Sequence, residues 1–369
     1  MNAATDTAGL LARFAPCLRY DSLEGYFADS AEEWTANPGN RLRRADGTVV
    51  ARAGDGLSLA FLDPSTYANG EAVQPGDYIE TSKDDYSHQY TALRAAHGEF
   101  RNVIYGRSVR SNTGEWLQYW FFYFLNDYQL AWGIDVHEGD WEMVQLRLPP
   151  GETEPDVAVY AQHTFCEVRP WAEVKRLAGE RSAAGEGADA RDSDRPLVYA
   201  GRGSHASFFE PGFHPTDFYD VTDGKRRPGD EARLVVVDDD PPWLRWPGQW
   251  GGKRTGYAGP ASPSRHAQWT DPEALLQGAR THEREPAPDA PRVWARRRGS
   301  RLLLEFDFSK MPGPPARLVV TVNSEDERDT PPQVHRFALK TVVRGSLETS
   351  ITLDQTKHYD VRTAVVTRS

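Results

Sequence analysis

The run WLQYWFFYFL at residues 116–125 constrains the fold more than any other part of the sequence. It is almost continuously apolar and rich in aromatic β-formers, which is typical of a central strand covered on both faces. No stretch of about 18 apolar residues occurs, so no membrane-spanning helix is expected. The run therefore predicts a buried sheet inside a β-rich protein.

Shorter β-forming runs bounded by Gly, Pro and Asp predict further strands at 102–109, 141–148, 156–163, 196–201 and 232–238. Their spacing favours a sandwich of antiparallel sheets over alternating strands and helices. The expected fold class is mainly β, a β-sandwich with short helices and long loops. One helix is expected to begin at Pro170, and another to follow a cap at Thr270 or Asp271.

Composition shifts divide the chain into two predicted domains. Residues 1–283 form the first, 284–291 a Pro-rich linker, and 292–369 a small immunoglobulin- or fibronectin-like β domain. The second domain shows no catalytic constellation, so its expected role is packing or contact with a protein partner. The polar segment 181–194 is predicted to be a flexible loop.

Charge and cysteine content exclude some classes of function. The net charge of −11 excludes nucleic acid as the main partner, because no basic stripe offsets that field. Cys17 and Cys166 are too few for a disulfide framework and are expected to be reduced. The first residues lack the basic and apolar regions of a secretory signal, so a cytoplasmic location is expected.

The segment HEGDWEMVQL at 137–146 carries the densest group of cation- and proton-binding side chains. Strand alternation places Asp140 and Glu142 on one face, at the end of a predicted sandwich core. Two carboxylates held together there repel one another, and a bound cation would relieve that repulsion. His137 can reach the same point from the preceding turn, where Gly139 permits a tight bend.

A fourth ligand is expected from the end of the preceding strand, where Asp127 and Asp135 compete. An oxygen-rich set of this kind favours calcium, magnesium or manganese, with zinc as a further option if water completes the shell. A hydrogen-bonded strand entry with surface carboxylates explains the same spacing, because His-x-x-Asp-x-Glu also arises by chance.

Two more histidines follow β-forming runs. His163 ends VAVYAQH, and His205 lies in GRGSHASF beside Gly203 and Ser204, whose backbone N–H groups are a candidate anion nest. A lone histidine is more often structural, but loops from one sandwich end could bring these four residues together as a ligand site. Ser204 lacks a Gly-x-Ser-x-Gly elbow, which disfavours serine catalysis.

The motifs around these residues resemble two related families. YFLND followed by HEGDWE is similar to the signature region of the necrosis- and ethylene-inducing-peptide-like proteins. More closely, FAPCLRYD, WLQYWFFY, HEGDWE, VYAQH, GRGSHASF, WLRWPGQWGG and QWTDP resemble the vacuolar protein sorting-associated family numbered sixty-two. Together these stretches span most of residues 11–272.

The resemblance implies a β-sandwich with a divalent cation at one end of its central sheet. Matched by motif, the ligands would be Asp127, His137, Asp140 and Glu142. The toxin family has His and Arg where this chain has Gly139 and Glu138, so the charge beside the ion differs. Membrane lysis, an activity of that secreted family, is therefore not carried over.

Three functions follow from these observations. The leading one is cation-dependent binding of a polar headgroup from a lipid, glycan or small molecule. A second is a metal-dependent hydrolase, lyase or cyclase in which His205 or His163 is the general acid or base. A third is an interaction protein with a purely structural cation.

Overall fold

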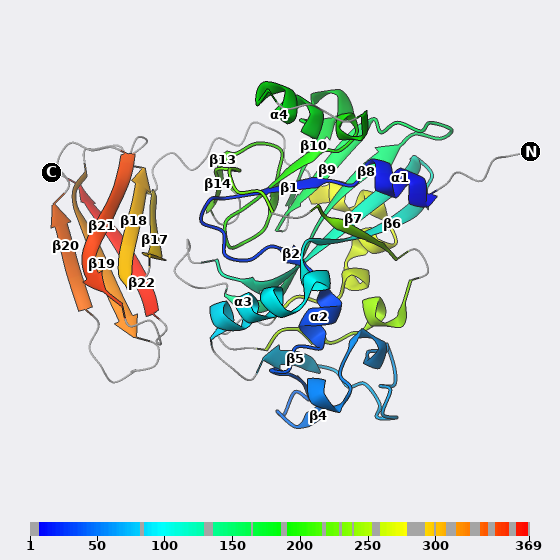
Figure 1. Cartoon of the computed structure of the whole chain (residues 1–369), viewed down its shortest axis with the longest axis horizontal. Coiled ribbons are helices and arrows are strands. Elements are labelled where there is room, and N and C mark those ends of the chain that lie inside the picture. Colours follow the sequence, from blue (N-terminus) through cyan, green and yellow to red (C-terminus); the bar gives the residue numbers. More distant parts are fainter. Residues whose placement is uncertain are drawn as a thin grey trace, which may run out of the picture. The chain divides into compact units, whose positions relative to one another are not determined.

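The chain divides into two compact units (Figure 1). Residues 1–126 and 137–283 belong to the first unit, and residues 127–136 and 284–369 to the second. The predicted linker 284–291 and Asp135 lie outside the residues that the structure describes. A computed structural model describes residues 7–81, 85–128, 136–163, 165–185, 190–215, 219–228, 231–237, 240–252, 259–278, 292–298, 300–307, 315–324, 333–338, 344–353 and 359–367.

A seven-stranded sheet forms the centre of the first unit and confirms the expected mainly β class. Its strands run in the order β10–β9–β8–β7–β6–β15, and β2 also pairs with β7. All pairings in it are antiparallel except that of β15 with β6. The strands are β2 (Ala28–Asp29), β6 (Val103–Ser111), β7 (Gly114–Asn126), β8 (His137–Leu148), β9 (Val157–Gln162), β10 (Phe165–Pro170) and β15 (Arg233–Val236).

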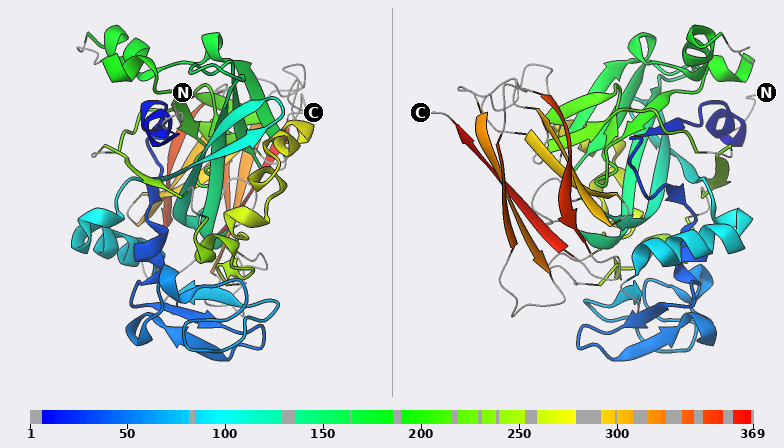
Figure 2. Two further views of the ribbon diagram at one scale, coloured as in Figure 1. Left: turned by 90° about the vertical axis from the view of Figure 1, so that its right-hand side faces the viewer. Right: turned by 60° about the vertical axis from the view of Figure 1, so that its left-hand side comes forward.

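The aromatic run lies in β7 and is covered on both faces, as predicted. On one face, buried Tyr119 donates its hydroxyl hydrogen to the carbonyl of Leu11 in α1 (Thr7–Arg13). On the other face, Gln118 donates to the carbonyl of Gln268. Figure 2, left, shows α1 and the yellow 3-10 turns near residue 268 on opposite sides of the sheet. Burial on both faces explains why the run lacks polar alternation.

Smaller sheets and short helices surround this centre. One sheet joins β1 (Cys17–Tyr20), β11 (Leu197–Ala200) and β12 (Ser207–Phe208). Another joins β3 (Asn40–Arg43), β4 (Val49–Arg52), β5 (Tyr78–Thr81) and β16 (Gln249–Trp250), and a third pairs β13 (Gly212–Pro215) with β14 (Tyr219–Thr222). The remaining α-helices are α2 (Ala31–Thr35), α3 (Tyr86–Ala96) and α4 (Leu177–Ala183).

The helix predictions were only partly correct. The α-helix expected at Pro170 is a 3-10 turn, and α4 begins later and runs into the segment predicted to be a loop. The segment after Asp271 is also a 3-10 helix. The 3-10 helices are η1 (Ala53–Asp55), η2 (Leu59–Phe61), η3 (Gly98–Phe100), η4 (Trp171–Glu173), η5 (Ala190–Ser193), η6 (Pro242–Arg245), η7 (Pro263–Arg265), η8 (Ala267–Trp269) and η9 (Pro272–Gly278).

The second unit contains two three-stranded sheets. One joins β17 (Arg292–Arg298), β18 (Arg301–Asp307) and β21 (Arg344–Thr352), and the other joins β20 (Gln333–Ala338), β19 (Pro315–Ser324) and β22 (Tyr359–Thr367). Apolar side chains from both sheets, including Leu304 and Val320, form one core. Its likeness to an immunoglobulin domain remains a prediction.

Two further expectations concern membranes and thiols. Among the described residues, no helix is both long and apolar enough to span a membrane.

Cys17 and Cys166 are free and buried, in agreement with the expectation that they are reduced. Burial raises the pKa of the Cys166 thiol to about 11, which keeps it protonated at neutral pH.

Candidate functional site

The first residues of β8 separate two acidic side chains that sequence alternation would place together. Gly139 lies between them with φ +63°, in the left-handed region. Glu138 accepts hydrogen bonds from the Thr81 amide at 3.0 Å and the Tyr86 hydroxyl at 2.9 Å. Asp140 instead contacts His205. The backbone turn at Gly139 thus gives the two carboxylates separate partners.

Close packing also requires glycine at position 139. A Cβ atom there would lie 2.1 Å from the backbone oxygen of Trp250, far inside van der Waals contact. Glu138, beside it, is buried among few compensating charges, and burial raises the pKa of its carboxyl to about 8. This end of β8 therefore combines a fixed backbone with a carboxyl that is protonated at neutral pH.

His205 is fully buried between two carboxylates. Its Nδ1 lies 2.9 Å from Asp140 Oδ2, and its Nε2 lies 3.6 Å from Glu24 Oε1. The ring stacks on Tyr123 with centroids 3.8 Å apart. Burial alone would lower the pKa of His205, but attraction to Glu24 and the hydrogen bond to Asp140 outweigh it and raise the pKa to about 9. His205 is therefore an imidazolium at neutral pH.

Glu24 is held in place by backbone donors from two loops. Its Oε1 accepts from the amides of Gly25 and Tyr26 at 2.8 and 2.9 Å, and its Oε2 accepts from the amide of Gly203 at 2.7 Å. Burial opposes the charge on Glu24, but His205 and these donors lower the pKa of its carboxyl. The N–H of Gly203, expected to bind an external anion, thus binds a carboxylate of the protein itself.

A second polar group connects His163, Ser204 and Asp220. His163 Nε2 lies 2.9 Å from Asp220 Oδ2, and the Ser204 hydroxyl donates to Asp220 Oδ1. Asp220 is fully buried on β14, and His163 has φ +56° at the end of β9. Because Ser204 bonds to the aspartate and not to a histidine, the serine–histidine pairing of serine hydrolases is not formed at Ser204.

His137 stands at the start of β8, opposite Asn126 at the end of β7. Its Nδ1 lies 2.7 Å from the carbonyl oxygen of Gly139, which can only accept, so Nδ1 carries the hydrogen. In the neutral ring, Nε2 then holds a lone pair, and it lies 3.2 Å from the Asn126 amide nitrogen. A backbone carbonyl that fixes the tautomer in this way is typical of metal-binding histidines.

The four predicted cation ligands are placed as follows. His137, Asp140 and Glu142 lie along β8, and Asp127 directly follows β7 within the second compact unit. Asp140 is buried and Glu142 is half-buried. The pKa of Tyr123 is raised mainly by burial, then by Tyr20, and then by the charges of Glu142 and Asp140. Their spacing is looser than that of a formed metal site, so the cation remains a prediction. Across the described chain, three ligand atoms come within 4.8 Å of one another only at Glu33, His97 and Glu99.

Four ligand-binding residues were predicted from the sequence: His163, Gly203, Ser204 and His205. In the structure they bond to two acidic residues, Asp220 and Glu24, that were not predicted. His163 and Ser204 share Asp220, while His205 and Gly203 share Glu24. Glu24 lies 179 residues before Gly203, and Asp220 lies 57 residues after His163 and 16 after Ser204. The sequence contains no spacing signal that links them.

Comparisons with known proteins identify remote structural neighbours. No protein-family model and no curated protein matches the chain. Solved structures of the necrosis- and ethylene-inducing toxin fold do match it, and the three named next each match 74% of this chain at a TM-score of 0.33. They include necrosis and ethylene inducing protein 2 from the causal agent of cocoa's witches' broom disease (14% identity, 91% of that chain), NLPPya in complex with mannosamine (14%, 92%) and non-toxic HaNLP3 (12%, 92%).

Replacing His205 by Gln should destabilise the protein in a pH-dependent way. The variant leaves Asp140 and Glu24 buried without a cation, which costs about 3–5 kcal/mol near pH 6.5. A histidine whose folded pKa is raised contributes its full stability below its unfolded pKa of 6.5 and loses it as pH rises through about 9. The difference between wild type and variant in urea unfolding should thus shrink by about 3 kcal/mol between pH 6.5 and 10. A stability difference that does not change with pH would contradict this expectation. So would an equal loss of stability on replacing His88, an exposed residue of α3, by Gln.

Gly139→Ala should destabilise the protein more than Gly47→Ala. Both glycines have positive φ, +63° and +88°, so both substitutions carry the backbone cost of about 1–2 kcal/mol. A Cβ at position 47 meets nothing within 4 Å, whereas one at position 139 meets the Trp250 carbonyl. Urea unfolding should show at least about 2 kcal/mol of additional loss for Gly139→Ala. Equal losses would show that β8 can move away from Trp250.

Proposed function

We propose that the first unit binds a polar headgroup of a lipid, glycan or small molecule through a divalent cation near the start of β8. The observation that carries the proposal is the fixed tautomer of His137, which leaves the Nε2 lone pair to accept from the Asn126 amide. An ion bound on the same strand end as Asp140 and Glu142 would take the place of that hydrogen bond. Three carboxylates beside one imidazole form an oxygen-rich set, which suits calcium, magnesium or manganese, with zinc as a further option.

The donor set fits such an ion in part. Asp140 uses Oδ2 for His205 and keeps Oδ1 for a cation, and half-buried Glu142 lies two residues further along β8. Asp127, the fourth ligand that the motif resemblance implies, is assigned to the second compact unit. A cation with open coordination positions accepts hydroxyl or phosphate oxygens directly, which is the chemistry that would recognise a headgroup.

The two ion pairs of His205 disfavour this histidine as a general base. A general base must be unprotonated to take a proton. His205 faces a carboxylate from each ring nitrogen, and His163 directs Nε2 at Asp220. His205 is thus arranged to hold a proton on each ring nitrogen, which disfavours it as a general base. His163, paired through one nitrogen with Asp220, is the histidine that the alternative of a metal-dependent enzyme would use.

Motif resemblance supports the same ligand choice. HEGDWE and the strand-end Asp127 match the cation-binding pattern of the toxin family, and membership of the family numbered sixty-two is proposed on the motifs alone. The second unit would then be a module for a protein partner, since it contributes no catalytic group to the proposal.

Chelator-treated protein should regain thermal stability when calcium, magnesium or manganese is added. A cation at 100 times its Kd stabilises the folded state by about 2.7 kcal/mol. Glu142→Gln should weaken the response at least tenfold, whereas Glu173→Gln, at an exposed carboxylate on η4, should not change it.

Headgroup binding should depend on the same ion. With glycans and lipid vesicles as probes, retention should disappear with chelator and in Glu142→Gln, and the bound probe should be recovered chemically unchanged. Absence of any cation response would refute the proposal. Chemical conversion of the probe would instead favour the alternative function, a metal-dependent hydrolase, lyase or cyclase.

A further inference from the structure

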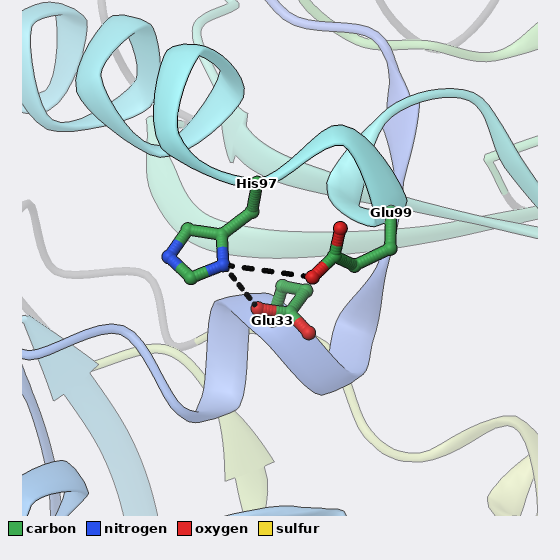
Figure 3. Close-up of side chains that lie close together, drawn as sticks. All are labelled: Glu33, His97 and Glu99. Carbon is green, nitrogen blue, oxygen red and sulfur yellow. Dashed lines mark ion pairs between the residues drawn. The ribbon is translucent and has the colours of Figure 1, made fainter.

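Three metal-ligating side chains meet away from β8, at the junction of α2, α3 and η3 (Figure 3). Glu33 lies on α2, His97 follows the last turn of α3, and Glu99 lies on η3. His97 Nδ1 lies 3.2 Å from Glu33 Oε2 and 3.8 Å from Glu99 Oε1. Figure 3 shows both carboxylates directed toward the same ring nitrogen.

The backbone beneath these side chains is cross-linked. The Ser30 amide donates to the Phe100 carbonyl at 2.8 Å, which joins the start of α2 to the end of η3. His97 bonds through its amide to Leu93 and through its carbonyl to the Phe100 amide. Phe100 itself is fully buried. The three ligand positions are therefore set by the fold, and only the side-chain ends remain free to adjust.

The spacing of the three ligand atoms is that of ligands around a small metal ion. Two donors bound at about 2.05 Å with a tetrahedral angle lie about 3.3 Å apart, close to the 3.2 and 3.8 Å observed. We propose that Glu33, His97 and Glu99 bind a divalent transition-metal ion of the zinc class, with water in the remaining positions.

Ligand chemistry favours zinc over calcium or magnesium at this point. Calcium and magnesium prefer shells made of oxygen, whereas an imidazole nitrogen beside two carboxylates suits zinc, cobalt or manganese. The three side chains are 23%, 43% and 62% exposed in the order Glu33, His97, Glu99, so an ion has direct access and space for water.

Neighbouring charges leave the site in need of a cation. Among the described residues, Glu33 and Glu99 form ion pairs with His97 alone. Glu32, next along α2, adds negative charge, while three nearby arginines bond to groups other than the carboxylates of Glu33 and Glu99. Arg94 pairs with Asp29, Arg101 donates to the Arg94 carbonyl, and Arg233 donates to the backbone carbonyl of Glu99. A neutral His97 thus leaves two carboxylates that a divalent ion would balance.

Cobalt and zinc titrations of the full chain test this site. Chelator-treated wild type should bind Co²⁺ with the visible absorption of a nitrogen- and oxygen-bound ion, and Zn²⁺ should displace it. His97→Ala and Glu33→Gln should each weaken binding at least tenfold. The matched control His88→Ala removes an exposed histidine of the same helix and should bind as wild type does.

The outcomes also separate this site from the one proposed at β8. Glu142→Gln should retain the cobalt signal that His97→Ala loses. Because His97 is partly exposed, its replacement should leave the circular dichroism spectrum unchanged, so loss of binding would report the missing ligand. Equal cobalt affinity in His97→Ala and wild type, equal weakening in His88→Ala, or no binding by wild type would overturn the proposal and leave His97 as an ion-pair partner only.

Discussion

The buried ion pairs of His205 with Asp140 and Glu24 hold together the end of the sandwich that contains the candidate site. They connect the loop after β1, the start of β8 and the loop after β11, three segments far apart in the sequence. Burying a charge without a partner costs several kcal/mol. Each of the three groups is therefore tolerated only because the other two are present, and the loops are fixed in position as a consequence.

Gly139 makes this arrangement compatible with the sheet. Its left-handed conformation directs Glu138 toward Thr81 and Asp140 toward His205, so two carboxylates that would repel one another on one face are separated. The same turn brings the Gly139 carbonyl to His137 Nδ1 and fixes the ring tautomer. The turn at Gly139 thus gives Glu138 and Asp140 different partners and orients the ring of a candidate ligand.

Much of the sheet could be predicted from the sequence, because a strand that is buried on both faces is apolar at nearly every position. The run 116–125 is apolar at nearly every position, and β7 contains it entirely. The helices were harder to predict: α3 has only a weak apolar face and begins after an Asp85 cap within a polar segment.

Near the site, His163, Ser204 and His205 could be found from motifs, but Glu24 and Asp220 could not. Their roles arise from long-range pairing, which local spacing does not encode.

The protonation state of His205 is the most direct test of the buried ion pairs with Asp140 and Glu24. Nuclear magnetic resonance of protein with ¹⁵N-labelled histidine reports both ring nitrogens of each side chain, and His205→Gln identifies the signal. We expect His205 to carry hydrogen on both nitrogens at pH 7.5 and to titrate near pH 9. A neutral ring at pH 7.5, with one nitrogen unprotonated, would contradict it and would restore His205 as a candidate base.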